Sequence, residues 1–458
     1  MAFSSVKFIP KRCVFESTLA CNLRCRHCGS RAGKARPHEL TTAEATGLFQ
    51  QLADLGCARV TISGGEAMTR QDWPDLIQSA ASTGMGVALI TNGLLFDRDA
   101  ALLARDRGLE AVGFSVDGIG RTHDLVRGKV GHFGRVEKAI SAAVDAGLQF
   151  AVLTHLNRQN IGELPQIHSF ANSHGAYAWQ VQTGTDMGSI SDHPELLLRA
   201  NDLIRAEAIV GDLVRRSDLH IAACNSFGYF GPHEKLLRKS TGKSKSGRRF
   251  RGCPAGIHTL GIESNGNVKG CLSIMPGDDE RGVPFVEGNI REESLAEIWH
   301  RPGAFSYNRE WNIGDLDGFC LECRHARRCR GGCTSNRVAS GNGTDNPICV
   351  HRAIVEKQQT SRRVGGAKAM LLASVLGTST MSCYEQERID DTFEESDAGK
   401  DGSTSGDTDT DTDTDTDTDT GTDTDVDTDA DTDTDTDTDT DIDGDVDADA
   451  YDVPPWNR

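Results

Sequence analysis

The chain has 458 residues, 14 of them cysteine, and a formal net charge of −19. The charge lies at one end, because residues 401–458 contain 23 aspartates and a single arginine and leave residues 1–400 at about +3. This near-neutral body has no basic stripe and argues against nucleic-acid binding, and no apolar run is long enough to cross a membrane. The first residues lack the apolar core of a secretory signal. We therefore expect a cytoplasmic protein, in which clustered cysteines are more often metal ligands than disulfides.

Short apolar segments alternate with helical patterns between residue 14 and about residue 183. Helices are predicted over residues 41–55, with Thr42 as a plausible N-cap, over 135–146, and near 195–216. A βα rhythm of this kind predicts an α/β fold with a parallel sheet, open or curled into a partial (β/α)6 barrel. The six predicted strands are 14–18, 59–64, 86–93, 110–118, 149–157 and 178–184.

Composition divides the rest of the chain. Residues 1–235 form the predicted core with a bridging helix, and 236–252 form a linker rich in Lys, Arg, Ser and Gly. A small cysteine-rich domain with little regular periodicity covers 253–352, followed by an extension over 353–400. Residues 401–458 repeat Asp and Thr with almost no apolar side chains, so we expect a disordered tail that is extended by self-repulsion.

Three cysteines, Cys21, Cys25 and Cys28, lie in "CNLRCRHC" just past the first predicted strand. A structural zinc site needs four ligands and a disulfide framework needs an even number of cysteines. Three thiolates on one loop can instead hold three corners of a [4Fe–4S] cluster and leave the fourth iron open. A zinc loop completed by His27 or His38 is the alternative.

This motif resembles the cluster loop of the radical S-adenosylmethionine (SAM) enzymes, although His27 stands where an aromatic residue is usual. The resemblance extends to "SGGEAM" (63–68), "FSVDG" (114–118) and "THDLVRG" (122–128). It implies that SAM binds the open iron and is cleaved to a 5′-deoxyadenosyl radical, which abstracts hydrogen from a substrate. The residues implied in SAM binding are Gly64, Gly65, Glu66, Ser115 and Arg127.

The resemblance implies a specific role in SAM binding for each of these residues. Gly64 and Gly65 let the backbone approach a ligand closely, Glu66 accepts from the ammonium group, and Ser115 faces the ribose. Arg127 pairs with the carboxylate of SAM; a charge on a surface loop is the alternative for this residue.

A second cysteine-rich region resembles the SPASM extension of radical SAM enzymes that mature peptides and proteins, a domain with two auxiliary iron–sulfur clusters. By this resemblance Cys320, Cys323, Cys329 and Cys349 hold one cluster, which we call the four-cysteine set. The other cluster is held by the three-cysteine set, which consists of Cys253, Cys271 and Cys333.

The three-cysteine set is one ligand short. Its cluster is open for substrate or solvent, or takes Cys224 or His258 as the fourth ligand. A pair of zinc knuckles is the alternative for the whole region.

Other cysteines have structural explanations. Cys13 and Cys57 are expected in the core. Cys383 and Tyr384 follow a short apolar run, which fits a C-terminal helix better than a fused substrate-like segment.

The resemblance covers residues 14–352 and implies a peptide or protein maturase supplied with electrons by a reductant such as flavodoxin or ferredoxin. Formylglycine formation is less favoured, because Leu272 stands where those relatives carry a proton-accepting Asp. A small-molecule substrate stays open, since relatives that act on tetrapyrroles share a similar cysteine motif. A non-catalytic iron–sulfur electron carrier and a zinc-stabilised binding module are the alternatives from other classes, and neither would need the glycine-lined segment.

Overall fold

The computed structural model describes residues 8–224, 226–240, 250–274, 285–341 and 343–363. These residues build one sheet with the strand order β10-β9-β8-β1-β2-β3-β4-β5-β6-β7. Strands β8, β1 and β2 to β7 run parallel, whereas β9 is antiparallel to both β8 and β10. The strands are β1 Arg12–Glu16, β2 Arg59–Ser63, β3 Gly86–Thr91, β4 Ala111–Ser115, β5 Gln149–Leu156, β6 Ala178–Thr183, β7 His220–Ala223, β8 Thr259–Ile262, β9 Asn267–Lys269 and β10 Gly288–Asn289.

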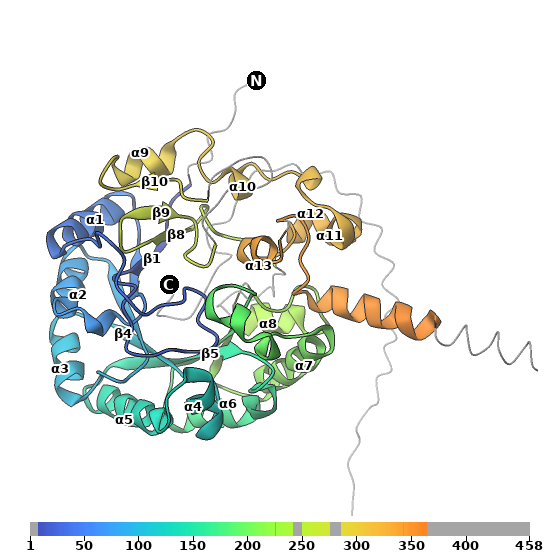
Figure 1. Cartoon of the computed structure of the whole chain (residues 1–458), viewed down its shortest axis with the longest axis horizontal. Coiled ribbons are helices and arrows are strands. Elements are labelled where there is room, and N and C mark those ends of the chain that lie inside the picture. The colour runs from blue at the N-terminus through green and yellow to red at the C-terminus, as the bar shows by residue number, and fades with distance from the viewer. Residues whose placement is uncertain (1–7, 225, 241–249, 275–284, 342, 364–458) are drawn as a thin grey trace, which may run out of the picture. The chain divides into compact units, whose positions relative to one another are not determined.

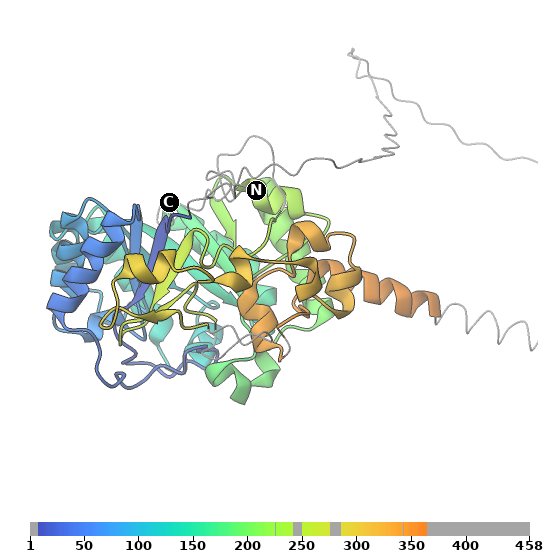
Figure 2. The same ribbon diagram turned by 90° about the horizontal axis from the view of Figure 1, so that it is seen from above.

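Helices lie along the outer face of the curved sheet (Figure 1). The core helices are α1 Thr42–Asp54, α2 Trp73–Ser82, α3 Arg98–Asp106, α4 Arg121–Arg127, α5 His132–Asp145, α6 Leu164–Ser173, α7 Ala200–Arg216 and α8 Glu234–Ser240. The cysteine-rich region adds α9 Leu295–His300, α10 Ser306–Arg309, α11 Gly318–Glu322, α12 Ala326–Cys329 and α13 Thr334–Ala339. Residues 350–363 form a further helix that is exposed along most of its length and projects outward (orange in Figures 1 and 2).

The predicted α/β architecture is confirmed, with differences at the boundaries. All six predicted strands are present, displaced by up to two or three residues at their ends. The N-cap of α1 is Thr41 and not Thr42, because the Thr41 hydroxyl accepts from the Glu44 N–H while the Glu44 carboxylate accepts from the Thr41 N–H at 2.8 Å. Such a reciprocal capping box satisfies two backbone donors at the helix start.

The sheet is longer than the six predicted strands at both edges. On one side β7 follows β6, and on the other side β8 pairs with β1 in parallel, with Arg12 opposite Thr259 and Phe15 opposite Ile262. The cysteine-rich region therefore begins as part of the main sheet. Helix α8 also covers the first residues of the predicted linker 236–252, while the predicted Asp/Thr tail and Cys383 lie outside the described residues.

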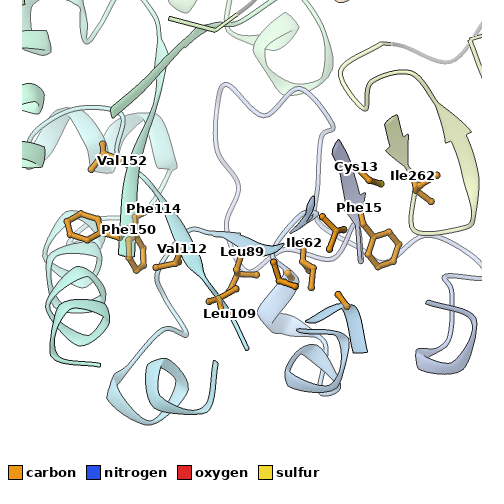
Figure 3. Close-up of a cluster of buried hydrophobic side chains, with 14 of the residues drawn as sticks. Cys13, Phe15, Ile62, Leu89, Leu109, Val112, Phe114, Phe150, Val152 and Ile262 are labelled. Atoms are coloured by element: carbon orange, nitrogen blue, oxygen red, sulfur yellow. The ribbon is translucent and has the colours of Figure 1, made fainter. Parts of the chain in front are cut away.

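Apolar side chains between the sheet and the helices form the core (Figure 3). Phe15 of β1 and Phe49 of α1 meet edge to face with ring centroids 5.6 Å apart, and neither is exposed. Cys13 and Cys57, at 1% and 5% exposure, belong to this core as predicted. None of the helices in the described part of the chain combines the length and the hydrophobicity that a membrane crossing requires.

The contact between β1 and α1 is open to a stability test. We expect Phe49→Ala to lower the free energy of unfolding by about 3–5 kcal/mol, because it removes a fully buried aromatic ring and leaves a cavity. Leu103→Ala, at a side chain that is 38% exposed, serves as the control and should change the free energy by less than about 0.5 kcal/mol. Denaturant unfolding followed by circular dichroism compares the two, and equal effects would contradict the packing.

Candidate active site

Cys21, Cys25 and Cys28 lie on the loop that leaves the carboxyl end of β1, and all three line one cavity of about 300 Å³. Two backbone N–H groups already donate to their sulfurs, from Leu23 to Cys21 Sγ at 3.4 Å and from Ala32 to Cys28 Sγ at 3.3 Å. Three sulfurs that face one cavity fit a cluster with an open corner. Their coordination of iron stays a prediction.

Burial opposes ionisation of these thiols. It raises the pKa of Cys25 to about 11, although the nearby Arg127 guanidinium lowers it in part. Burial also raises the pKa of Cys21, against a backbone hydrogen bond from Leu23. Cys21 and Cys25 are therefore protonated at neutral pH in the absence of a cation, and metal binding would have to release their protons.

The same cavity collects every residue expected to bind SAM: Gly64, Gly65, Glu66, Ser115 and Arg127. Parallel strands bring these residues together, because Gly64–Glu66 follow β2 and Ser115 ends β4, and the carboxyl ends of parallel strands meet at one edge of a sheet. A volume of about 300 Å³ lies at the lower end of the range for small-molecule pockets. SAM contacts by these residues stay a prediction.

The structure gives a second reason why glycine is required at positions 64 and 65, besides the close approach of a ligand. A Cβ on Gly64 would lie 2.3 Å from the Thr18 carbonyl oxygen, and one on Gly65 would lie 2.3 Å from that of Ala20. At the same place the Gly65 N–H donates to Thr18 O at 2.7 Å and the Glu66 N–H to Ala20 O at 2.8 Å. Gly64 and Gly65 thus let the backbone after β2 pack directly on the cluster loop and hold it in register.

Glu66 is 1% exposed, and protein donors already engage both of its carboxylate oxygens. Oε1 accepts from the Thr91 hydroxyl at 2.9 Å and from the Met68 N–H at 3.3 Å, and Oε2 accepts from the Asn92 N–H at 2.8 Å. Burial raises the pKa of Glu66, and the hydrogen bond from Asn92 opposes that rise. Glu66 therefore fixes the end of β2 to the end of β3 and also presents an acceptor to the cavity.

Arg127 is not a surface charge, because its side chain is only 11% exposed and pairs with Asp117, whose side chain is fully buried. The Arg127 Nε lies 2.6 Å from Asp117 Oδ2, and its Nη1 lies 3.8 Å from Cys25 Sγ. Burial alone would raise the pKa of Asp117, but Arg127 and then His27 hold it well below its usual range. The pair fixes the Arg127 guanidinium beside Cys25 at the wall of the cavity.

Asp117 lies within the motif "FSVDG" (114–118), but no role was predicted for it from the sequence. It gathers three further groups: the His27 ring at 3.3 Å, the His155 N–H at 2.7 Å, and, through its own N–H, the His123 Nδ1 at 3.1 Å. His27 also packs on His155 with ring centroids 4.4 Å apart. The one sequence signal that could have pointed to Asp117 is its place two residues after a parallel strand.

Further polar residues of the cavity were not predicted either. One of them follows β3 and the others lie on β5 and β6, and this place on or after a parallel strand is the only sequence signal they carry. These residues are Asn92, His155, Gln180 and Gln182.

The four-cysteine set comes together as one group. Cys320, Cys323, Cys329 and Cys349 all line one small cavity, together with Tyr229 and Phe230. Burial raises the pKa of both Cys320 and Cys349 to about 12.

The three-cysteine set also converges. The Cys333 thiol is hydrogen-bonded to the Cys253 sulfur and lowers the pKa of Cys253, and Cys271 lies close enough for the charge of Cys253 to raise its pKa further after burial. All seven predicted auxiliary cysteines therefore fall into the two expected groups, while iron binding by either group stays a prediction.

Within the described residues, no three or more His, Cys, Asp or Glu side chains are placed to hold a single metal ion.

Comparison with known proteins finds a matching family for the core and for the cysteine-rich region. Residues 15–171 match the family model of the radical SAM superfamily, and residues 253–324 match that of an iron–sulfur cluster-binding domain, SPASM. The chain is 28% identical to the AdoMet-dependent heme synthase of Methanosarcina barkeri (strain Fusaro / DSM 804), over 75% of this chain and 97% of that protein. It is 25% identical to the PqqA peptide cyclase of Rhizobium meliloti (strain 1021), over 76% of this chain and 89% of that protein.

A solved structure supports the fold. Streptococcus suis SuiB, bound to its precursor peptide SuiA, superposes with a TM-score of 0.57 and covers 74% of this chain and 75% of its own. At 17% identity this likeness concerns the fold alone.

The packing of the cluster loop on Gly65 can be tested directly. We expect Gly65→Ala to lose most of the iron bound at Cys21, Cys25 and Cys28, because the new Cβ would displace the backbone of Leu19 and Ala20. Gly47→Ala is the control, since a Cβ at Gly47 in α1 meets nothing within 4 Å. Iron per chain after anaerobic reconstitution measures the difference, and normal loading of Gly65→Ala would show that the loop does not need this contact.

The ion pair of Asp117 predicts a second effect. Asp117→Asn leaves the Arg127 guanidinium without its buried partner, so we expect the free energy of unfolding to fall by about 3–5 kcal/mol and the loop to load less iron. Because the folded-state pKa of Asp117 is lowered, its contribution is present above about pH 4 and is lost as the pH falls further. Denaturant unfolding compares this variant with Asp145→Asn, at an exposed position; indistinguishable variants would refute a structural role for the pair.

Proposed function

Since this chain is a radical SAM enzyme with a C-terminal iron–sulfur SPASM domain, we propose that it acts on a peptide or protein and installs a post-translational modification. The observation that carries this proposal is the shared cavity, which joins the three cysteines of the cluster loop to all five residues expected around SAM.

The residues present fit the cofactors of this superfamily. Cys21, Cys25 and Cys28 would hold three irons of a [4Fe–4S] cluster, and the open side of the cavity would take SAM. With both bound, the chemistry supplied is reductive cleavage of SAM to a 5′-deoxyadenosyl radical, which takes a hydrogen atom from the substrate.

The protein's own groups orient the ligand. Arg127, fixed by Asp117, would face the carboxylate of SAM, and Glu66 would accept from its ammonium group while it stays bound to the end of β3. Ser115 would face the ribose. His155, Gln180 and Gln182, on β5 and β6, line the same cavity, where the substrate would have to meet SAM.

The auxiliary cysteines support the proposal that the oxidation state of the substrate changes in the reaction. The three-cysteine and four-cysteine sets would each hold an iron–sulfur cluster, and such clusters supply one-electron redox chemistry. An external reductant such as flavodoxin or ferredoxin would supply the electron that begins the reaction.

A peptide or protein substrate is supported by the likeness to a protein named as a peptide cyclase and by the fold shared with a protein solved with its precursor peptide. A tetrapyrrole is the second candidate, because the chain matches nearly the whole length of a heme synthase at 28% identity. A non-catalytic electron carrier is disfavoured, since both of these relatives are enzymes.

Release of 5′-deoxyadenosine from SAM tests the function. We expect the anaerobically reconstituted and reduced protein to release it, Cys25→Ala to release none, and Cys57→Ala to behave as wild type because Cys57 lies in the core. Stimulation by a metallated tetrapyrrole would favour the second candidate over a peptide. Absence of release from iron-loaded wild type, with and without added peptides and tetrapyrroles, would contradict the proposal.

A further inference from the structure

We infer that Cys224 is the fourth thiolate of the three-cysteine set, beside Cys253, Cys271 and Cys333. This inference rests on the proposal that the set holds an iron–sulfur cluster. Its consequence is that this cluster has no open iron, so it carries electrons and does not anchor the substrate.

The turn that begins at Cys224 is fixed next to Cys333. Cys224 follows β7, and its carbonyl accepts from the Phe227 N–H at 3.0 Å. Within this turn the Ser226 carbonyl accepts from the Asn336 side chain at 3.2 Å and from the Thr183 hydroxyl at 2.6 Å. Asn336 belongs to α13, whose N-cap is Cys333. The end of β7 and the start of α13 are therefore bound to each other.

A second contact fixes the same segment from its other end. The Cys333 N–H donates to the Tyr229 hydroxyl at 3.1 Å, and Tyr229 also packs in one cluster with Cys333 and Cys349. Tyr229 and Phe230 also line the cavity of the four-cysteine set.

The Cys224 side chain itself lies near the three-cysteine set. Cys271 is close enough for its charge to act on the Cys224 thiol. Unlike Cys13 and Cys57, Cys224 is partly exposed and is not sealed in the apolar core.

His258, the other candidate, has different neighbours. Burial, and then the nearby charges of Lys11 and Arg12, lower the pKa of its ring. Its backbone carbonyl also accepts from the Arg12 N–H at 3.2 Å, which ties it to the amino end of β1. We assign the ligand to Cys224 because its turn is bound to α13, the helix that Cys333 caps.

The chemistry of this assignment is simple. Each iron at a corner of a [4Fe–4S] cluster takes one protein ligand, usually a thiolate. When Cys224 binds, its S–H bond is replaced by an S–Fe bond and one proton passes to solvent, with no change in oxidation state.

The experiment uses the full chain with Cys21, Cys25 and Cys28 changed to Ala, so that only the auxiliary clusters contribute. Cys224→Ala is then compared with Cys57→Ala by iron content and by electron paramagnetic resonance (EPR) of the reduced protein. We expect Cys224→Ala to lose about one cluster of iron or to shift the signal of one cluster, and Cys224→Ser to keep more iron with a shifted signal. Cys57→Ala should match the parent.

Two results would overturn the inference in different ways. Unchanged iron and an unchanged spectrum in Cys224→Ala, or an equal change in Cys57→Ala, would remove Cys224 as a ligand and leave the auxiliary clusters in place. A parent protein that binds no iron would also remove the auxiliary clusters from the proposed function.

If neither Cys224 variant folds, iron-loaded wild-type protein decides the matter. Alkylation of Cys224 by iodoacetamide, measured by mass spectrometry, should begin only after the iron is chelated. An equal rate before and after chelation would contradict the assignment.

Discussion

The buried carboxylate of Asp117 holds the candidate active site together. It follows β4 and receives Arg127 from α4, the His27 ring from the cluster loop and the His155 N–H from β5. A buried carboxylate is tolerated only when charge and hydrogen bonds compensate its lost hydration, so each of these partners is constrained to face it. Since the cluster loop contains no helix or strand over residues 21–28, contacts of this kind determine its shape.

The cysteine-rich region shares its framework with the core. Its first strand, β8, pairs with β1, the strand from which the cluster loop departs, and Arg291 pairs with Glu44 at the start of α1 with Nε and Oε1 2.6 Å apart. On the opposite edge of the sheet, the segment after β7 reaches both auxiliary sets through Asn336 and Tyr229. The three groups of cysteines are thus held by the ends of strands of one sheet.

Local patterns predicted much of this arrangement, because cysteine spacing and alternating strands and helices are properties of short segments. Contacts between distant segments were not predictable in the same way. Gly64 and Gly65 were expected to admit a ligand, yet the tightest constraint on them is the backbone of Thr18 and Ala20, more than forty residues earlier. Asp117 was overlooked because its partners come from three other elements, and β8 was overlooked because a four-residue strand carries too little periodicity to stand out.

The central claim is that SAM binds in this cavity at the open corner of a cluster held by Cys21, Cys25 and Cys28. Electron–nuclear double resonance of the reduced protein, with SAM labelled at its amino nitrogen and carboxylate oxygens, tests this most directly. The account predicts hyperfine coupling of both labels to a cluster that is absent from Cys25→Ala. A reduced cluster at these cysteines that shows no coupling to either label would contradict it.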